Sequence, residues 1–158
     1  MVNVVFVKAK GGSIGDWFTS LFNEGTGLCH CEFALPDGRR FGARPGGTRF
    51  YTSGFGAARE ILLPVGLTPE VLLPWLQKER GSPYDYVGVF RFALPFLRGS
   101  KDKWFCSELV AAALRDLAGW DIDPAKARPS TVYFHVGEKC AAGPATPASR
   151  PLPRVDTR

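Results

Sequence analysis

Alternation of apolar and polar residues dominates the first half of the chain. Residues 1–7 and 28–35 follow this period of two, and five short segments are predicted as strands, at residues 3–7, 28–35, 39–43, 48–51 and 60–64. Pro36, Asp37 and Gly38 form a turn signal between the second and third segments. We therefore predict a β-hairpin at this turn.

The second half changes to the spacing of three and four residues that is typical of amphipathic helices. It predicts helices at residues 69–80, after the N-cap Thr68, and at 84–92 with an extension toward 96, 105–118 and 130–138. An earlier helix is predicted at residues 13–22, with Ser13 as its N-cap. Strands followed by helices indicate the α+β class.

Length and composition are those of one globular domain. The chain has 158 residues, 45% of them hydrophobic, which is enough for a core that folds alone. We assign residues 1–139 to a single domain. Residues 140–158 are rich in proline and alanine and bury little, so a disordered or extended tail is predicted there.

The net charge limits the classes of binding partner but does not identify a specific one. The net charge of +5 favours anionic polymers such as cell-wall glycans or acidic lipid surfaces. The basic residues are scattered, so specific nucleic-acid binding is not expected. Neither a signal peptide nor a run long enough for a transmembrane helix is present, which predicts a chain that is cytoplasmic at synthesis, with release by phage lysis or a signal-independent route. The sequence gives no indication of the oligomeric state.

Cys106 is the first candidate for chemistry, because it lies where a polar loop becomes an apolar helix. A thiol at a helix N-terminus faces unpaired N–H groups and the positive end of the dipole, which lower its pKa and provide an oxyanion site. The alternative is that Cys106 is a small buried hydrophobic residue. A base close in space would favour the nucleophile.

His30 is the natural candidate for that base, since an imidazole beside a thiol forms a thiolate–imidazolium pair. His135, the other histidine, lies near the end of the predicted domain and is the competitor. Cys29 and Cys31 flank His30 on a predicted strand, so both thiols should point away from the imidazole. This arrangement and the lack of a C-x-x-C pair argue against a metal site, and no cofactor is expected.

A catalytic imidazole usually needs a third group that fixes its tautomer. Glu32 is two residues after His30 and therefore on the same strand face. The alternative interpretation of Glu32 is a carboxylate on the strand that is exposed to solvent. Asp85 and Glu108 are the other acidic candidates for the orienting role.

Two segments carry a resemblance to a known family: GSPY at residues 81–84 with Gly88, and FCSELV at residues 105–110. They resemble the G-x-P-Y-x-x-G and D-C-S-G-L-V motifs of NlpC/P60 cysteine peptidases. Here the histidine segment TGLCHCEF, residues 26–33, precedes the cysteine. That order is similar to the circularly permuted branch, the YaeF/YiiX-like papain-fold amidases, which has bacterial and bacteriophage members.

The resemblance covers about residues 2–135 and implies a permuted papain-like fold, in which a small antiparallel sheet or partial barrel packs against helices. It implies that Cys106 is the nucleophile, at a helix N-terminus, and His30 the base, with Glu32 as the best match for the third group. Tyr84 matches a motif tyrosine that lines the substrate cleft. Phe105 stands where the standard motif has an acidic residue, and Glu108 replaces its glycine.

Three functions follow from these expectations. The first is a cysteine hydrolase that cleaves an amide bond in a peptide or a peptidoglycan stem through a thioester. The second is a lipid acyltransferase or thioesterase that uses the same cysteine on a lipid-linked acyl substrate, with the apolar residues 84–97 along an acyl site. The third is a binding module that keeps the fold without turnover.

Overall fold

The computed structural model describes residues 1–10, 25–87 and 103–142. Its centre is an antiparallel sheet of five strands within this described part, in the order β4-β3-β2-β1-β5. The strands are β1 (Asn3–Lys8), β2 (Leu28–Ala34), β3 (Arg40–Arg44), β4 (Gly47–Tyr51) and β5 (Glu60–Pro64). The α+β class and all five predicted strands are confirmed.

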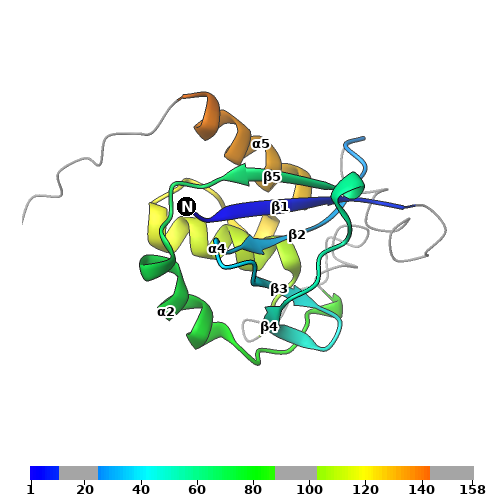
Figure 1. Cartoon of the computed structure of the whole chain (residues 1–158), viewed down its shortest axis with the longest axis vertical. Coiled ribbons are helices and arrows are strands. Elements are labelled where there is room, and N and C mark those ends of the chain that lie inside the picture. Colours follow the sequence, from blue (N-terminus) through cyan, green and yellow to red (C-terminus); the bar gives the residue numbers. More distant parts are fainter. Residues whose placement is uncertain (11–24, 88–102, 143–158) are drawn as a thin grey trace, which may run out of the picture.

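Helices cover one face of the sheet. They are α2 (Pro69–Glu79), α4 (Cys106–Ala118) and α5 (Pro129–Ala141), with short 3₁₀ turns at Ala57–Arg59 and Pro124–Lys126. α4 contacts β2 and β3, α5 contacts β2 and β5, and α2 packs on α4. In Figure 1 α4 lies behind the sheet, and the segment before β5 passes in front.

The core fills the space between the sheet and the helices. From the strands, Phe6, Phe33 and Phe41 point into it and are fully buried. From α4, Leu109 and Leu114 meet them. Burying a large apolar side chain contributes roughly 1.5–3 kcal/mol, so this layer supplies most of the driving force for folding.

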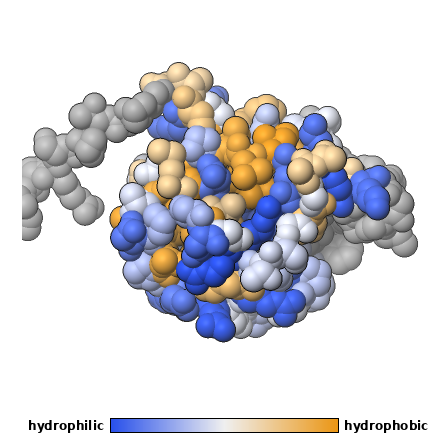
Figure 2. All heavy atoms as spheres, viewed as in Figure 1, coloured by the Kyte–Doolittle hydropathy of each residue, from blue (hydrophilic) through white to orange (hydrophobic). Residues whose placement is uncertain are grey.

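The opposite face of the sheet has a smaller apolar cluster of Val5, Val7 and Cys29, with Phe55 packed against it. Figure 2 views this face, and apolar atoms gather over β5 while hydrophilic atoms lie over the other end of the sheet. Leu62 of β5, which pairs with Val5 of β1, is 49% exposed. Polar side chains of β2, β3 and β5 share the rest of this face.

A β-bulge interrupts the regular alternation at the start of β2. Val7 pairs with His30 and Lys8 pairs with Leu28, so Cys29 is the extra residue. Cys29 therefore packs with Val5 and Val7, whereas Cys31 belongs to the main core. The expectation that both cysteines point to the same side is wrong, because period-two counting fails across a bulge.

Other predictions differ at element boundaries or lie outside the described residues. Helix 13–22 and most of the predicted helix 84–96 lie outside. Tyr84 forms an isolated bridge with Trp104 and does not begin a helix. α5 extends to Ala141, so the first two residues assigned to the tail are helical. In the described part no helix has the length and apolarity needed to cross a bilayer.

Candidate functional site

Cys106 is the first residue of α4. The preceding Phe105 is the N-cap and has no side-chain acceptor, and Glu108 accepts the Phe105 N–H at 3.2 Å. This bond is the half of a capping box in which the N3 carboxylate accepts the N-cap N–H, and it fixes the start of α4. Ser107 Oγ donates to the Ala127 carbonyl at 2.6 Å and anchors the helix start.

His30 approaches the site from β2. Its side chain is 12% exposed, and its Nε2 lies 3.1 Å from Glu32 Oε2. The ring also packs on Phe55, with 5.1 Å between the centroids. Because Glu32 holds Nε2, Nδ1 is the ring nitrogen that remains for an interaction with a second group.

Cys106 and His30 are brought together and change each other's ionisation. Burial alone would raise the pKa of the Cys106 thiol, but hydrogen bonds from Cys31 and the charge and hydrogen bond of His30 hold it well below its ordinary range. Burial alone would lower the pKa of His30, but the Cys106 thiolate and Glu32 raise it to about 9. The arrangement therefore favours a thiolate–imidazolium pair at neutral pH.

Glu32 is a fully buried carboxylate with a complete set of donors. Besides His30, it accepts Arg44 Nε at 3.0 Å and Arg44 Nη2 at 2.8 Å, and Arg40 Nη1 lies 3.5 Å from Oε1. Burial alone would raise the Glu32 pKa, but the bonds from His30 and Arg44 lower it below its ordinary value. Glu32 is therefore ionised and aimed at the imidazole.

Gly42 on β3 makes room for this carboxylate. A Cβ atom at Gly42 would lie 2.7 Å from Glu32 Cβ and 3.0 Å from Oε2. Both distances are shorter than van der Waals contact, so a larger residue would displace the Glu32 side chain. The glycine is thus a steric requirement of the network.

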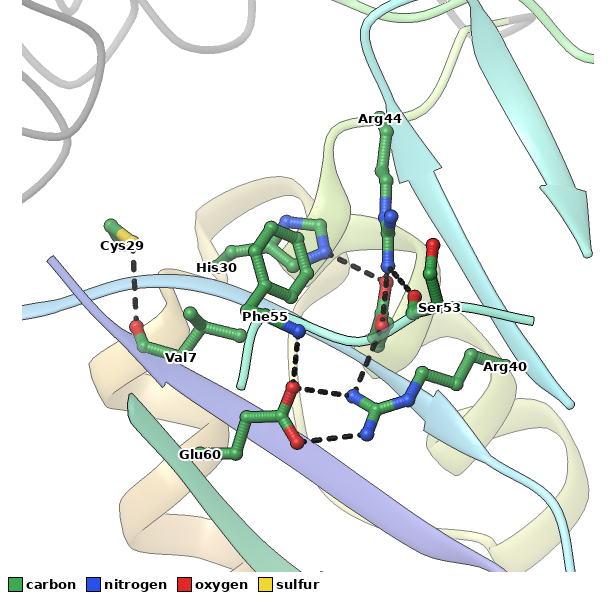
Figure 3. A network of polar contacts seen from close by, with 9 residues as sticks. Val7, Cys29, His30, Arg40, Arg44, Ser53, Phe55 and Glu60 are labelled. Atoms are coloured by element: carbon green, nitrogen blue, oxygen red, sulfur yellow. Dashed lines mark hydrogen bonds and ion pairs between the residues drawn. The ribbon is translucent and has the colours of Figure 1, made fainter. Parts of the chain in front are cut away.

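A second ion pair closes the network toward β5. Arg40 donates to both Glu60 oxygens, at 2.9 and 2.8 Å, and the backbone N–H of Phe55 donates to Glu60 Oε1. Gly54 is close to this pair, since a Cβ there would lie 2.6 Å from Glu60 Oε1. Figure 3 shows how Ser53 and Phe55 of this loop lie over Arg44 and His30.

Tyr84 lies near Cys106, close enough for the two groups to affect each other's ionisation. Its ring packs on Phe105 at 6.3 Å and on Tyr86 at 4.9 Å between centroids. Burial and the nearby Cys106 thiolate raise the pKa of its phenol. Tyr84 therefore stays a neutral hydroxyl that is available as a donor or acceptor near the sulfur.

The alternative residues have other roles. His135 makes its hydrogen bond to the Thr131 carbonyl of its own helix, at 3.0 Å. Glu108 caps α4, and the Asp85 backbone N–H donates to the Trp104 carbonyl at 3.0 Å. Of the sequence candidates, the structure brings together Cys106, His30, Glu32 and Tyr84.

Two neighbours of the site were not predicted. Cys31 is fully buried, and both its thiol and its backbone hydrogen-bond Cys106; burial and the Cys106 thiolate raise the Cys31 pKa well above its ordinary value. Arg44 binds Glu32. Strand alternation placed Cys31 on the face opposite His30, and Arg44 becomes visible only when the register of β2 on β3 is known.

Cys106 is 1% exposed, so its sulfur is shielded from solvent. In the described ranges no three His, Cys, Asp or Glu side chains are grouped so that they could hold a metal ion.

Comparison with known proteins gives no relative. No family model, no curated protein and no solved structure matches this chain.

Proposed function

We propose that this chain is a cysteine hydrolase that cleaves an amide bond. What carries the proposal is that Cys106, the first residue of α4, and His30 of β2 lie close enough to shift each other's pKa, and that the buried Glu32 carboxylate lies 3.1 Å from Nε2 of the imidazole. A thiolate, a proton donor and an orienting carboxylate are the three groups that acyl transfer through a thioester needs. A cysteine with only a packing role would not require a neighbouring proton donor or an orienting carboxylate.

The proposed reaction begins with attack of the Cys106 thiolate on the amide carbonyl carbon. The carbonyl π electrons move to oxygen, and first-turn N–H groups of α4 hold the oxyanion. The C–N bond then breaks, and the amine leaves with the proton from His30. Since the pKa of His30 is about 9, its imidazole carries that proton at neutral pH.

Hydrolysis of the thioester completes the cycle. Neutral His30 takes a proton from water, the resulting hydroxide attacks the acyl carbon, and the sulfur leaves as a thiolate. The carboxylic acid loses its proton at neutral pH, and the pair returns to its starting state. Glu32 stays ionised throughout, because its role is to hold the ring and stabilise the imidazolium.

The fold we infer is the circularly permuted papain-like fold of the NlpC/P60 superfamily. A histidine strand that precedes a cysteine helix supports this inference, as does the antiparallel sheet packed on α4. The substrate class that fits this inference is a peptide or a peptidoglycan stem. The net charge of +5 is compatible with an anionic cell-wall polymer.

The test is turnover of peptide and muropeptide amides by wild type, Cys106→Ala and Cys140→Ala. Cys140 is an exposed thiol on α5 and serves as the matched control. We expect Cys106→Ala to lose roughly 10⁴-fold or more in kcat, and Cys140→Ala to keep wild-type rates. Intact-protein mass spectrometry after an acid quench should show the acyl half of the substrate on Cys106.

Undiminished turnover in Cys106→Ala would refute the mechanism. Incubation with phospholipid or an acyl thioester separates the competing chemistry. A stable acyl adduct from these compounds, with no amide cleavage, would replace the hydrolase by an acyltransferase that uses the same cysteine.

A further inference from the structure

We propose that Arg44 is a positioning residue of this site, which holds Glu32 in the orientation that fixes His30. The inference rests on the proposed function and adds a residue that acts through two others. Arg44 is on β3 and touches neither Cys106 nor His30 through a hydrogen bond in the described contacts. Its effect reaches the sulfur by way of the Glu32 carboxylate.

The first support is the geometry of the Arg44–Glu32 pair. Two different nitrogens of one guanidinium bind the two oxygens of one carboxylate, at 3.0 Å to Oε2 and 2.8 Å to Oε1. Such a fork fixes the plane of the carboxylate as well as its position. Oε2 is also the atom that His30 Nε2 meets at 3.1 Å, so the plane set by Arg44 determines the direction of that bond.

The second support is that Arg44 is itself held rigidly. Its guanidinium lies 3.8 Å from the Tyr51 ring centroid and 4.4 Å from that of Phe55, and Nη2 also donates to the Ser53 carbonyl at 3.3 Å. A planar cation between aromatic rings keeps its orientation. A lysine has the charge but neither the fork nor this stacking.

The third support comes from Phe55, which contacts both ends of the chain of interactions. Its ring packs on Arg44 and on His30, and its backbone N–H donates to Glu60. The Ser53–Phe55 segment therefore lies over the polar network, as Figure 3 shows. Arg44, like His30, contacts both this segment and Glu32.

Arg40, the second arginine near Glu32, has a different task. Its two hydrogen bonds go to Glu60, and its distance to Glu32 Oε1 is 3.5 Å. Arg40 therefore meets Glu32 through one longer contact to a single oxygen, which constrains the carboxylate plane less than the two bonds from Arg44. We therefore assign the positioning role to Arg44.

The charged and titratable groups around Glu32 set the sign of the expected pH effect. They are His30 and Cys31 on β2, Arg40 and Arg44 on β3, and Glu60 on β5. Removing Arg44 leaves a fully buried carboxylate with less positive charge near it. The pKa of Glu32 then rises, and a protonated Glu32 no longer accepts the hydrogen bond of the imidazolium.

The experiment measures kcat and KM against pH for wild type, Arg44→Gln, Arg44→Lys and the matched control Arg39→Gln. Arg39 precedes β3, and its exposed side chain pairs with Asp37. We expect Arg44→Gln to lose roughly 10- to 100-fold in kcat at mildly acidic pH, by analogy with residues that orient a ligating side chain, with KM within about twofold. Its acid limb should move to higher pH.

Arg44→Lys should shift the acid limb less than Arg44→Gln while it still lowers kcat, because it keeps the charge and loses the fork. Arg39→Gln should match wild type. In a double-mutant cycle, Arg44→Gln should cost nothing further once Glu32→Gln is present. A loss that is equal at all pH values, or that persists in the Glu32→Gln background, would mean that Arg44 only stabilises the fold.

A second readout does not depend on turnover. Carbon-13 NMR of the glutamate carboxyl groups, with the Glu32 signal assigned from Glu32→Gln, should show a higher Glu32 pKa in Arg44→Gln than in wild type. An unchanged Glu32 titration would overturn the Arg44 assignment. Absence of Cys106-dependent cleavage in wild type would instead remove the proposed function, while the NMR titration still decides whether Arg44 holds the carboxylate.

Discussion

The two faces of the sheet are built from alternate residues of the same strands, yet they have opposite characters. Phe33 of β2 enters the apolar core under α4, whereas its neighbour Glu32 points to the other face and is buried among arginines. The burial of both side chains is complete. One face gains stability from apolar packing, and the other holds charges in a fixed geometry that is costly unless every charge is paired.

Cys106 and His30 come from opposite sides of this division. The cysteine belongs to the helix layer, and the histidine shares its strand face with Glu32. The hydrogen-bonded ladder of β2 with β3 has only the pairs Phe33–Phe41 and Ala34–Arg40, so it ends before His30. The site thus lies where the pairing of the two strands has stopped, and the backbone of Cys31 hydrogen-bonds Cys106 there.

The largest effect is expected for His30→Ala, which changes the polar face and leaves the apolar core intact. Loss of the imidazole removes the proton donor and the charge that stabilises the thiolate, so kcat should fall by roughly 10²- to 10⁴-fold. Turnover of the peptide substrate measures it, with thermal unfolding as a check on the fold. His135→Ala is the control, because that histidine bonds its own helix. Equal losses in both variants would refute the assignment of the base.

Phe33→Ala should instead lower the stability of the fold and leave the Cys106–His30 site intact. It leaves a cavity in the core under α4, and we expect the free energy of unfolding to fall by about 3–5 kcal/mol. Denaturant titration measures the change. The folded fraction should retain the raised His30 pKa, measured by NMR titration of the imidazole. A change of less than about 1 kcal/mol would contradict the view that this face supplies the stability.

Gly42→Ala tests the polar face by steric means alone. The new methyl group would meet Glu32 Cβ at 2.7 Å, so either the carboxylate or β3 must shift. We expect a loss of about 1–3 kcal/mol in stability, as for other overpacked sites, together with reduced turnover. Gly137→Ala on α5 is the control, since a Cβ there meets nothing within 4 Å. Wild-type turnover in Gly42→Ala would show that the Glu32 carboxylate can shift without loss of activity.

Period-two alternation was enough to predict the strands and to place Glu32 beside His30, because residues i and i+2 share a face. The helix tip made Cys106 a candidate, and His30 and the motif resemblance were needed to favour it as the nucleophile. The bulge at Cys29 and the position of Arg44 were beyond the sequence, since both depend on how neighbouring strands pair. Cys31 was missed for a related reason: its face is defined by alternation, but its contact with Cys106 is defined by how α4 packs.

The pH behaviour of the Cys106–His30 pair has a definite sign. When the protein is folded at neutral pH, the pair holds one proton, on His30; when it is unfolded, the pair also holds one proton, on the sulfur. The contribution of this pair to stability is therefore nearly flat from about pH 6.5 to 8.5, although both pKa values are shifted. Ionisation of the sulfur itself is the property to measure.

The most direct test of the account is the ultraviolet absorbance of the Cys106 thiolate against pH, taken as wild type minus Cys106→Ala. We predict a thiolate that is fully formed at neutral pH, with a midpoint well below the ordinary value of about 8.5. The midpoint should rise toward that value in His30→Ala. A wild-type midpoint at or above about 8.5 that His30→Ala leaves unchanged would contradict the thiolate–imidazolium pair.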